Sequence, residues 1–270
     1  MNNDEILEKW RKEQIKLKEK LIISDTEQWQ SKKLIYSADS ETSEDGLRYV
    51  AGLDISFVKD ANTACSGLFI FDIYDNMKIV YEDIDEYLIE MKEPYIPGYL
   101  AYREAPFLLK KLNRLKVNKP SLYPQCIFID GNGILHKEKF GMACHIGVLT
   151  NTPTIGISKK LCQTYGLENN QDHKDKIKSC LLKEGDYFEL LSDEKVPSLL
   201  GYTYRSTQTS TNPIYVSVGH KISWETCLWI LKLVISKYRM PDPLRQADLL
   251  TREKIRQIGA ETKDEKGWIN

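Results

Sequence analysis

Three acidic residues stand where their side chains could form a metal site. Asp54 lies inside the apolar run 49–58, Asp130 ends the apolar run 126–130, and Glu104 opens a run that is typical of a helix. A carboxylate in a buried strand, or at its tip, is costly unless its charge is compensated. Oxygen ligands suit Mg²⁺ or Mn²⁺, and two such ions can hold the attacking and leaving oxygens of a phosphodiester displacement. The acids therefore indicate a divalent-ion site.

The alternative is that each acid caps a helix or lies on the surface. For Glu104 taken alone, the sequence favours this alternative. For Asp54 and Asp130 it favours the metal site, because both residues stand where apolar ones are expected. On an extended strand, Asp54 shares its face with Gly52 and Ser56, whose small side chains would leave room for an ion and its waters.

The elements that must position these acids predict an α/β domain. Strands are expected at about 48–58, 63–73 and 77–90, and the short breaks between them predict antiparallel neighbours. A helix at about 99–117, a strand at 124–130, a helix near 141–150 and a strand at 154–158 follow. Strands joined through helices pair in parallel. We therefore expect a mixed sheet, with three antiparallel strands and then parallel strands, flanked by helices.

The rest of the chain suggests one main domain with two appendages. Residues 1–36 form an extension with a helix-permissive stretch at 4–33, and residues 37–258 form the main domain. Within that domain we expect a polar loop at 37–46, a polar excursion at 162–195, strands near 186–191, 199–205 and 213–218, and helices near 223–238 and 243–258. Residues 259–270 are charged and predict a frayed tail.

Composition limits the class of protein. In 270 residues, 41% are hydrophobic and 29% are charged, which is typical of a soluble globular protein. No apolar run is long enough for a membrane span, and the N-terminus lacks a secretory pattern, so we expect no membrane partner. The net charge of −1 argues against non-specific wrapping in nucleic acid.

Local charge differs from the average. The windows 105–129, 139–167 and 196–224 contain lysine, arginine or histidine but no acid. Such windows in a near-neutral chain are what a focused phosphate-binding face would produce. For the first window, a solvated helix face is an equally good interpretation.

The cysteines indicate a reducing compartment. The chain has 6 of them, at Cys65, Cys126, Cys144, Cys162, Cys180 and Cys227, and none forms a Cys-x-x-Cys pair. We interpret them as reduced thiols in or near the core of a cytoplasmic protein, with the nucleus or nucleolus as a further location. A zinc site built from them is the alternative.

A series of short motifs makes the chain resemble a known family. In order, they are Gly52-Leu53-Asp54-Ile55-Ser56-Phe57, Pro94-Tyr95-Ile96-Pro97-Gly98, Tyr102-Arg103-Glu104, Asp130-Gly131-Asn132-Gly133-Ile134-Leu135-His136, and the segments 141–148, 156–161, 218–221 and 241–248. With the order of elements and the three acids, the series resembles the endonuclease V family, which has a ribonuclease-H-like fold. The resemblance covers roughly residues 48 to 256.

The resemblance implies roles for the charged residues. Asp54 and Asp130 would hold Mg²⁺ directly, with Mn²⁺ able to substitute, and Glu104 would hold it directly or through water. His220 would lie close by and order a water or the scissile phosphate. Lys159 would contact phosphate near the cut. Asp248, in the last motif, is a further candidate.

The resemblance also implies a way of reading a base. Tyr95 would be a wedge inserted where the recognised base leaves the stack, and the prolines around it would hold its ring rigidly. The pocket for a flipped hypoxanthine would be lined by Gly98, Leu100, Gly131, Gly133, His136, Gly141 and Met142. Glycines suit such a pocket because backbone N–H groups can approach the base closely. Lys137-Glu138 stand where many bacterial members have Pro-Arg, so the contacts of this loop are expected to differ.

The family and its animal-like segments at 167–170 and 173–177 imply a specific activity. We expect a Mg²⁺-dependent endoribonuclease that cleaves inosine-containing single-stranded RNA at the second phosphodiester bond 3′ to inosine and leaves 3′-hydroxyl and 5′-phosphate ends. The first alternative is a repair endonuclease for deoxyinosine in DNA. The second is an inosine-binding protein without catalysis. We expect a monomer that binds nucleic acid.

Overall fold

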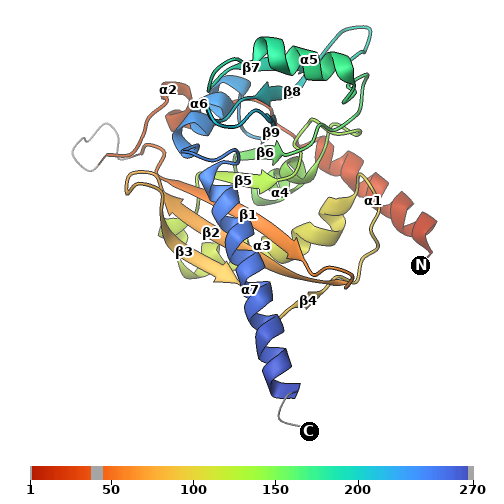
Figure 1. Ribbon diagram of the computed structural model, residues 1–270, viewed down its shortest axis with the longest axis vertical. Helices are drawn as coiled ribbons and strands as arrows, with labels where there is room; N and C mark the ends of the chain where they lie inside the picture. The colour runs from red at the N-terminus through yellow and green to blue at the C-terminus, as the bar shows by residue number, and fades with distance from the viewer. Residues whose placement is uncertain (1, 38–44, 267–270) are drawn as a thin grey trace.

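A single mixed sheet forms the centre of the molecule. The computed structural model describes residues 2–37 and 45–266, with side chains described as far as residue 260. Within these residues the strand order is β3-β2-β1-β5-β6-β9-β8-β7, and β4 pairs with β2 outside this path (Figure 1). The mixed sheet predicted from the sequence is confirmed.

The first part of the sheet is antiparallel, as the short breaks in the sequence predict. It consists of β1 (Tyr49–Phe57), β2 (Thr63–Asp72), β3 (Lys78–Ile84) and β4 (Ile89–Glu90). Strand β1 pairs with β2, and β2 pairs with β3, both antiparallel. The strand expected at 77–90 is interrupted after Ile84, and only its last two residues return to pair with β2.

The second part contains the parallel strands. Strands β5 (Cys126–Asp130) and β6 (Thr154–Ser158) run parallel to β1, and the register aligns Leu53 with Ile129. The next residues along, Asp54 and Asp130, therefore stand at the same height on neighbouring strands. Strands β9 (Ile214–His220), β8 (Leu199–Tyr204) and β7 (Tyr187–Leu191) complete the sheet in antiparallel order.

Helices cover both faces of the sheet. On one face, α3 (Leu100–Asn118) and α4 (Met142–Thr150) pack against Ala51 and Leu53 of β1. On the other, α6 (Trp224–Val234) and α7 (Asp242–Lys266) pack against the apolar residues of a second cluster that includes Val50. A short 3₁₀ helix, Pro120–Leu122, leads into β5. Strand β1 thus alternates between two cores, as its sequence predicts.

The N-terminal extension differs from the single helix expected at 4–33. Helix α1 (Asn3–Lys18) ends early, and α2 (Gln28–Lys32) begins only after an irregular segment. That segment is fixed by tertiary hydrogen bonds. The N–H of Ile22 donates to Nδ1 of His220, and the Asp25 carboxylate accepts from Ser223 and Thr226 at the start of α6. These bonds outweigh a helix propensity that nothing in the local sequence opposes.

Two further boundaries differ from the sequence interpretation. The polar excursion contains a helix, α5 (Gln171–Cys180), whose first turn is capped by the Asn170 side chain accepting from the N–H of His173. Helix α7 continues to Lys266, past the end expected at 258, so the tail predicted to fray is helical as far as it is described. Most of the loop expected at 37–46, and residues 267–270, lie outside the described residues.

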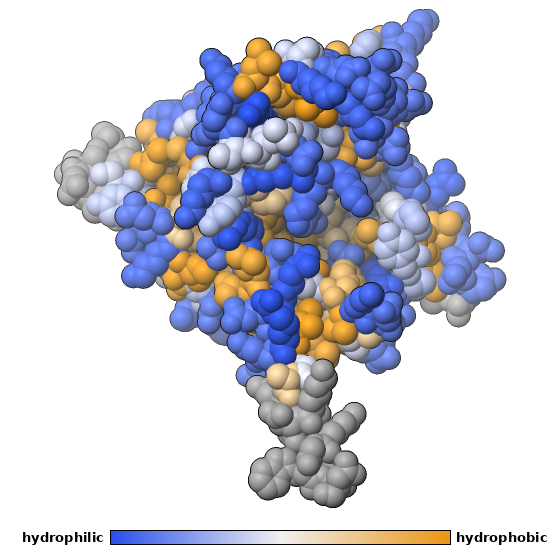
Figure 2. Space-filling view, in the orientation of Figure 1, coloured by the Kyte–Doolittle hydropathy of each residue, from blue (hydrophilic) through white to orange (hydrophobic). Residues whose placement is uncertain are grey.

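The surface in Figure 2 is dominated by hydrophilic side chains, with apolar atoms in separated groups. None of the described helices combines the length and apolar character that a membrane crossing requires.

Candidate active site

Asp54 is buried in the sheet and held by two hydroxyl groups. Its side chain is 7% exposed. Its Oδ2 accepts hydrogen bonds from Ser56 Oγ at 2.9 Å and from Thr251 Oγ1 of α7 at 2.6 Å. The two hydroxyls also contact each other at 2.8 Å. Asp54 is therefore fixed by its own strand and by a helix almost two hundred residues further along the chain.

The small residues beside Asp54 have a different role from the one expected. Gly52 brings the start of α7 onto the sheet, because a Cβ at this position would lie 2.1 Å from the carbonyl oxygen of Pro243. Ser56 donates to Asp54 instead of leaving space beside it. Their small size therefore allows α7 to approach and to place Thr251 and Asp248 near the carboxylate.

Burial, with a smaller contribution from neighbouring carboxylates, raises the pKa of the acids. Burial raises the pKa of Asp54 to about 6, with the Thr251 and Ser56 hydrogen bonds opposing and Asp248 and Asp130 adding to the rise. Burial raises the pKa of Glu104 to about 7, with Arg103 opposing and the carboxylates of Asp54 and Asp130 adding to it. Glu104, at the start of α3, therefore lies within electrostatic range of both strand acids, as predicted.

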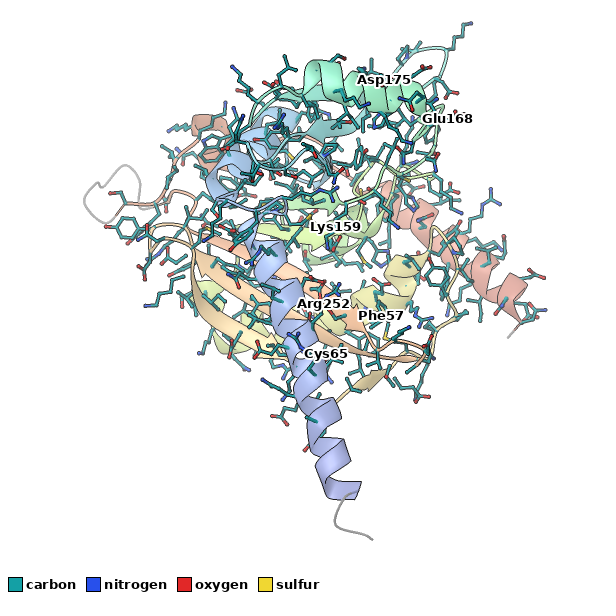
Figure 3. All side chains as sticks on the ribbon, viewed as in Figure 1. Phe57, Cys65, Lys159, Glu168, Asp175 and Arg252 are labelled. Atoms are coloured by element: carbon teal, nitrogen blue, oxygen red, sulfur yellow. The ribbon has the colours of Figure 1, made fainter. Side chains whose placement is uncertain are left out.

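Basic side chains only partly compensate this charge. Lys159, which follows β6, places its Nζ 3.5 Å from Asp130 Oδ2, yet burial still raises the pKa of Asp130. Arg252 on α7 donates from Nε to Asp248 Oδ1 at 2.7 Å. This hydrogen bond is the largest of the effects that raise the pKa of Arg252. Figure 3 shows Lys159 at the end of β6 and Arg252 on α7 below it.

The donor set fits a hard divalent cation. It consists of carboxylate oxygens, which suit Mg²⁺ and Mn²⁺ and not the soft metals. Burial raises the pKa of Asp54 and of Glu104, so the ionised form of each is disfavoured unless a cation compensates it. In the part of the chain that the structure describes, no three His, Cys, Asp or Glu side chains are arranged so that they could already hold an ion. The metal role of the acids stays a prediction.

His220 lies away from the acids. It is the last residue of β9 and pairs with Thr154 at the start of β6, whereas Asp130 pairs with Ile157. The two residues are therefore roughly 10 Å apart along β6. His220 is 2% exposed, its Nδ1 accepts from the N–H of Ile22 at 3.2 Å, and burial lowers its pKa to about 4. The expected placement of His220 is wrong, and its contacts anchor the segment after α1.

A cavity opens beside the acids. It has a volume of about 360 Å³, within the range of small-molecule sites. Its lining includes six of the seven residues predicted to form a base pocket, namely Gly98, Leu100, Gly131, His136, Gly141 and Met142. Glu104 and Asp130 line it too. The structure therefore brings most of the predicted pocket together with two of the three predicted metal ligands, and Asp54 does not line the cavity.

The seventh predicted pocket residue, Gly133, supports the cavity from behind. A Cβ at Gly133 would lie 2.0 Å from the carbonyl oxygen of Val218 on β9, and its N–H donates to Ser217 Oγ at 2.7 Å. The glycine is thus needed for close packing against the sheet, and it does not line the cavity. This corrects the prediction for Gly133.

Polar groups in the cavity could orient a ligand. The Nδ1 atom of His136 accepts from the N–H of Glu138, and burial lowers the pKa of His136 to about 4. The imidazole is therefore neutral near pH 7, and its Nε2 carries the hydrogen. The Oδ1 atom of Asn132 is buried and accepts no hydrogen bond from the described residues. The cavity thus offers one donor and one unused acceptor.

Tyr95 stands in the loop that leads to α3, two residues before Pro97, which lines the cavity. Its side chain is 65% exposed. Gly98, three residues on, has a φ of +86° and lines the cavity, so it ends the loop in a backbone conformation that favours glycine. The Tyr95 ring is thus exposed in the loop that contributes Pro97 and Gly98 to the cavity, and its role as a wedge stays a prediction.

Several residues of the site were missed by the sequence interpretation. Thr251 donates a hydrogen bond to Asp54, and Asn132 lines the cavity. Each belongs to a segment that the sequence interpretation treated only as a helix or a loop. The signal for Thr251 was its position three residues after Asp248, one turn of α7 away. Gln14 of α1 also lines the cavity, and nothing in its own sequence neighbourhood marks it.

The cysteines are free thiols. Four of them are buried, Cys162 is half-buried and Cys180 is exposed. Burial raises the pKa of Cys126, Cys144 and Cys227, which keeps these thiols protonated near pH 7. Most of them are therefore core residues, as expected.

Comparison with known proteins identifies relatives over almost the whole chain. The family model described as Endonuclease V matches residues 30–249. Endonuclease V of Mus musculus is 44% identical over 255 residues, which are 94% of this chain and 71% of the mouse protein. Endonuclease V of Homo sapiens is 42% identical over 94% of this chain and 85% of the human protein.

Solved structures agree with the sequence relatives. The catalytic domain of human endonuclease V is similar with a TM-score of 0.84 and 40% identity, covering 95% of this chain and 98% of the human one. A variant of Ciona intestinalis endonuclease V, in complex with a 23mer DNA containing an inosine followed by a ribo-adenosine, has a TM-score of 0.80 at 31% identity. It covers 96% of this chain and 100% of the Ciona chain.

Proposed function

The chain belongs to the endonuclease V family of nucleases, which hydrolyse phosphodiester bonds, and from this premise we propose its substrate and mechanism. We propose a Mg²⁺-dependent endoribonuclease for inosine-containing single-stranded RNA. It would cut at the second phosphodiester bond 3′ to inosine and leave 3′-hydroxyl and 5′-phosphate ends.

One observation carries the proposal: two of the three acids line the cavity. Glu104 and Asp130 line the same cavity as His136, Gly98 and Gly141. A base that leaves the stack and enters this cavity would bring its own strand past the carboxylates. The distance between the recognised base and the cut would then be set by the protein, which suits cleavage at a fixed offset.

The polar groups of the cavity suit hypoxanthine. This base presents an N1–H donor and an O6 acceptor, whereas adenine presents an N1 acceptor and an amino group. Asn132 Oδ1 is the unused buried acceptor and would bind N1–H. The Nε2–H of His136 is a donor for an acceptor of the base. Guanine shares N1–H and O6, so its extra 2-amino group would have to be rejected by the cavity wall.

The residues around the cut would divide the remaining tasks. Asp54 and Asp130 would hold Mg²⁺, with Glu104 directly or through water. The bound ion would stabilise charge on the phosphate and lower the pKa of a water molecule. Lys159, which reaches Asp130, would contact a phosphate oxygen beside it. Ser56 and Thr251 would keep the Asp54 carboxylate in place while the substrate binds.

Tyr95 would keep the base out of the stack. Its exposed ring could fill the gap that the base leaves between its neighbours, and aromatic rings stack on bases without regard to sequence. This would favour the flipped state of any base, so selectivity would rest on the cavity and not on Tyr95.

A second candidate substrate is DNA. The two Ciona intestinalis complexes hold DNA strands that contain an inosine followed by a ribo-adenosine. For this chain, these complexes raise two questions. The first is whether it cuts a DNA strand, and the second is whether one ribose next to the cut is sufficient for cleavage. A 2′-hydroxyl is the feature by which a protein tells RNA from DNA at one position.

Matched oligonucleotides test the proposal. Four single strands would carry inosine at one position, as all-RNA, as all-DNA, as DNA with one ribose 3′ to the inosine, and as RNA with adenosine in place of inosine. We expect cleavage of the first and third strands in Mg²⁺, and none in chelator. Equal cleavage of the inosine and adenosine strands would exclude the proposed specificity. Preference for all-DNA would select the repair alternative.

Two variants locate the activity. Asp130→Asn should bind the inosine strand but fail to cut it, because one carboxylate of the site is lost. Asn132→Ala should still cut, with a smaller preference for inosine over adenosine. Binding without cleavage by the unaltered protein, in both Mg²⁺ and Mn²⁺, would instead favour an inosine-binding protein.

A further inference from the structure

Helix α1 precedes the residues that the family model matches, yet it is part of the cavity wall. The match begins at residue 30, whereas α1 spans Asn3–Lys18. In Figure 1 α1 lies beside α3 and α4, the two helices that carry Glu104 and Met142. One of its residues, Gln14, lines the cavity.

The helix is docked by aromatic contacts. The Trp10 ring stacks on Tyr102 of α3, with ring centroids 5.1 Å apart and planes at 9°. The Tyr102 hydroxyl donates to the carbonyl oxygen of Trp10 at 2.9 Å. On its other side, Tyr102 meets the edge of His145 of α4 at 4.9 Å. Trp10 is 6% exposed, so α1 is fixed against the two helices beside the site.

From this position two side chains of α1 hold the loop 136–141. Gln14 is 5% exposed and donates from Nε2 to the carbonyl oxygen of Phe140 at 3.1 Å. Lys18, one turn later on the same face, donates from Nζ to the carbonyl oxygen of Glu138 at 2.7 Å. Both bonds are made to backbone atoms of the loop, so they fix its path whatever its side chains are.

This loop forms one side of the cavity. His136, Lys137, Phe140 and Gly141 line it. The residues from Leu135 to Phe140 belong to no helix or strand, so their position depends on such bonds. Farther from α1, the Tyr165 hydroxyl donates to the carbonyl oxygen of Lys137 at 2.8 Å. The loop is thus held by α1, by the segment after β6 and, through the Lys139 side chain, by Glu194 and Ser198 between β7 and β8.

We infer that α1 sets the base selectivity of the site, with Gln14 and Lys18 as positioning residues that hold the loop 136–141 against the bound base. The inference rests on the proposed function. It adds that selectivity depends on a helix that precedes the residues 30–249 matched by the family model. Without the two bonds the loop can move away from the base, and a cavity that closes less tightly rejects a larger purine less well.

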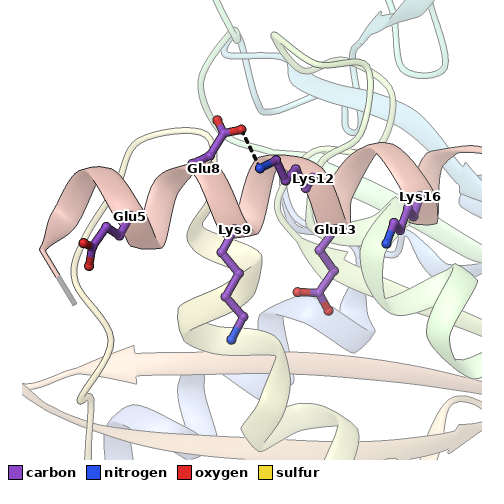
Figure 4. A pocket seen from close by; sticks show the side chains of 6 residues that line it. All are labelled: Glu5, Glu8, Lys9, Lys12, Glu13 and Lys16. Carbon is purple, nitrogen blue, oxygen red and sulfur yellow. Dashed lines mark ion pairs between the residues drawn. The ribbon is translucent and has the colours of Figure 1, made fainter.

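The opposite face of α1 provides a matched control. Figure 4 shows its six charged residues, Glu5, Glu8, Lys9, Lys12, Glu13 and Lys16. They all belong to α1, and Lys12 pairs with Glu8 at 3.2 Å in an exposed ion pair. Lys12→Met and Lys18→Met therefore make the same chemical change on the same helix, and only the second releases the loop.

Equilibrium binding tests the inference in the full-length protein. The variants are Gln14→Met, which keeps the side-chain length but removes the donor, Lys18→Met, the double variant, and the control Lys12→Met. Each is titrated, in chelator so that no strand is cut, with fluorescent single-stranded RNA carrying inosine or guanosine at one position. The readout is the ratio of the two dissociation constants, with the thermal midpoint of each variant measured alongside.

We expect the preference for inosine over guanosine to fall by about 3- to 10-fold in Gln14→Met and in Lys18→Met, as befits the loss of one hydrogen bond. The double variant should lose more, and Lys12→Met should keep the full preference. Lys18 is exposed, so this variant preserves the test if Gln14→Met does not fold.

Two outcomes would count against the inference in different ways. If the unaltered protein binds the inosine and guanosine strands equally, the proposed function fails, and the inference fails with it. If the unaltered protein prefers inosine and all variants keep that preference, the inference alone fails, and α1 serves packing only.

Discussion

Two clusters of acidic residues among the described ones differ in how their charge is balanced. At the end of β3, Asp83 and Asp85 meet Lys111 of α3, whose Nζ lies 3.2 Å and 2.7 Å from their carboxylates. Arg114 adds an Nε at 3.1 Å from Asp83. By contrast, Asp54 inside β1, Glu104 in α3 and Asp130 at the end of β5 lie within electrostatic range of one another. Asp54 is buried, Glu104 is half-buried and the Asp130 side chain is 35% exposed, and loss of hydration raises the pKa of each.

The difference separates structural charge from functional charge. In the cluster around Lys111, which we call the balanced cluster, Lys111 and Arg114 form ion pairs with Asp83 and Asp85. The Lys111 side chain is 2% exposed. In the acidic site, Lys159 pairs with Asp130, and Arg252 pairs with the neighbouring Asp248. Asp54 and Glu104 form no direct ion pair with any described residue. A fold retains uncompensated buried charge where a ligand can use it.

The largest expected effect is on catalysis at the unbalanced site. Asp54→Ala should lower the rate of inosine-strand cleavage by at least about 10³-fold, because a metal ion held by carboxylates contributes several kcal/mol to transition-state stabilisation. Single-turnover assays in saturating Mg²⁺ would measure it. Binding of the uncut strand should change little. Full activity in this variant would remove Asp54 from the mechanism and end the functional contrast between the clusters.

The balanced cluster should respond in stability and not in catalysis. Lys111→Met leaves two buried carboxylates without their shared cation and should lower the free energy of unfolding by about 3–5 kcal/mol. Urea denaturation measures the loss. The neighbouring exposed Lys110→Met is the matched control and should unfold like the unaltered protein. If Lys111→Met reduced the cleavage rate per folded molecule, the balanced cluster would be functional too.

The sequence predicted most of the acidic site, because its signal is local. An acid inside an apolar strand is visible without the fold, and the alternation of β1 correctly predicts that Asp54 turns away from Ala51 and Leu53. The family, the mixed sheet and the nuclease activity were predicted correctly for the same reason: their motifs lie on consecutive elements. The pairing of β1 with β5, and the register that brings Asp54 and Asp130 to the same height, were not predicted.

What the sequence did not predict depends on contacts between distant segments. His220 looked like a catalytic residue because of its motif, but the antiparallel register of β9 places it at the other end of β6. Gln14 and Thr251 reach the site from the two ends of the chain. The break after α1 follows from the bonds of Asp25 to α6, about two hundred residues away. Propensity and spacing carry no information on such contacts.

A smaller effect tests how Asp54 is held. Thr251→Val keeps the shape of the side chain but removes the hydroxyl that donates to Asp54 at 2.6 Å. We expect cleavage to fall by about 10–100-fold, the usual cost of removing a group that orients a metal ligand. A Mg²⁺ titration of the rate would show the loss as weaker metal dependence. Thr251→Ser should retain near-normal activity, and a similar loss in both variants would indicate packing instead.

The smallest effect is on the free energy of unfolding. Removing a charge should raise it at Asp54 and lower it at Lys111. Because the pKa of Asp54 is about 6 in the folded protein, above its ordinary value, the folded state binds the proton more tightly than the unfolded chain does. The stability that this proton contributes is fully present below pH 4 or so and is lost as the pH rises through about 6. Neutralising Asp54 should therefore stabilise the metal-free protein, whereas neutralising Lys111 destabilises it.

Asp54→Asn in chelator should raise the free energy of unfolding by about 2 kcal/mol near pH 8, and the gain should shrink towards zero near pH 4. Urea denaturation at the two pH values would measure the difference. Mg²⁺ should stabilise the unaltered protein more than the variant, because ion binding compensates the same charge. A variant less stable than the unaltered protein near pH 8 would mean that the hydrogen bonds from Ser56 and Thr251 already compensate Asp54, and the two clusters would then differ in composition but not in energetics.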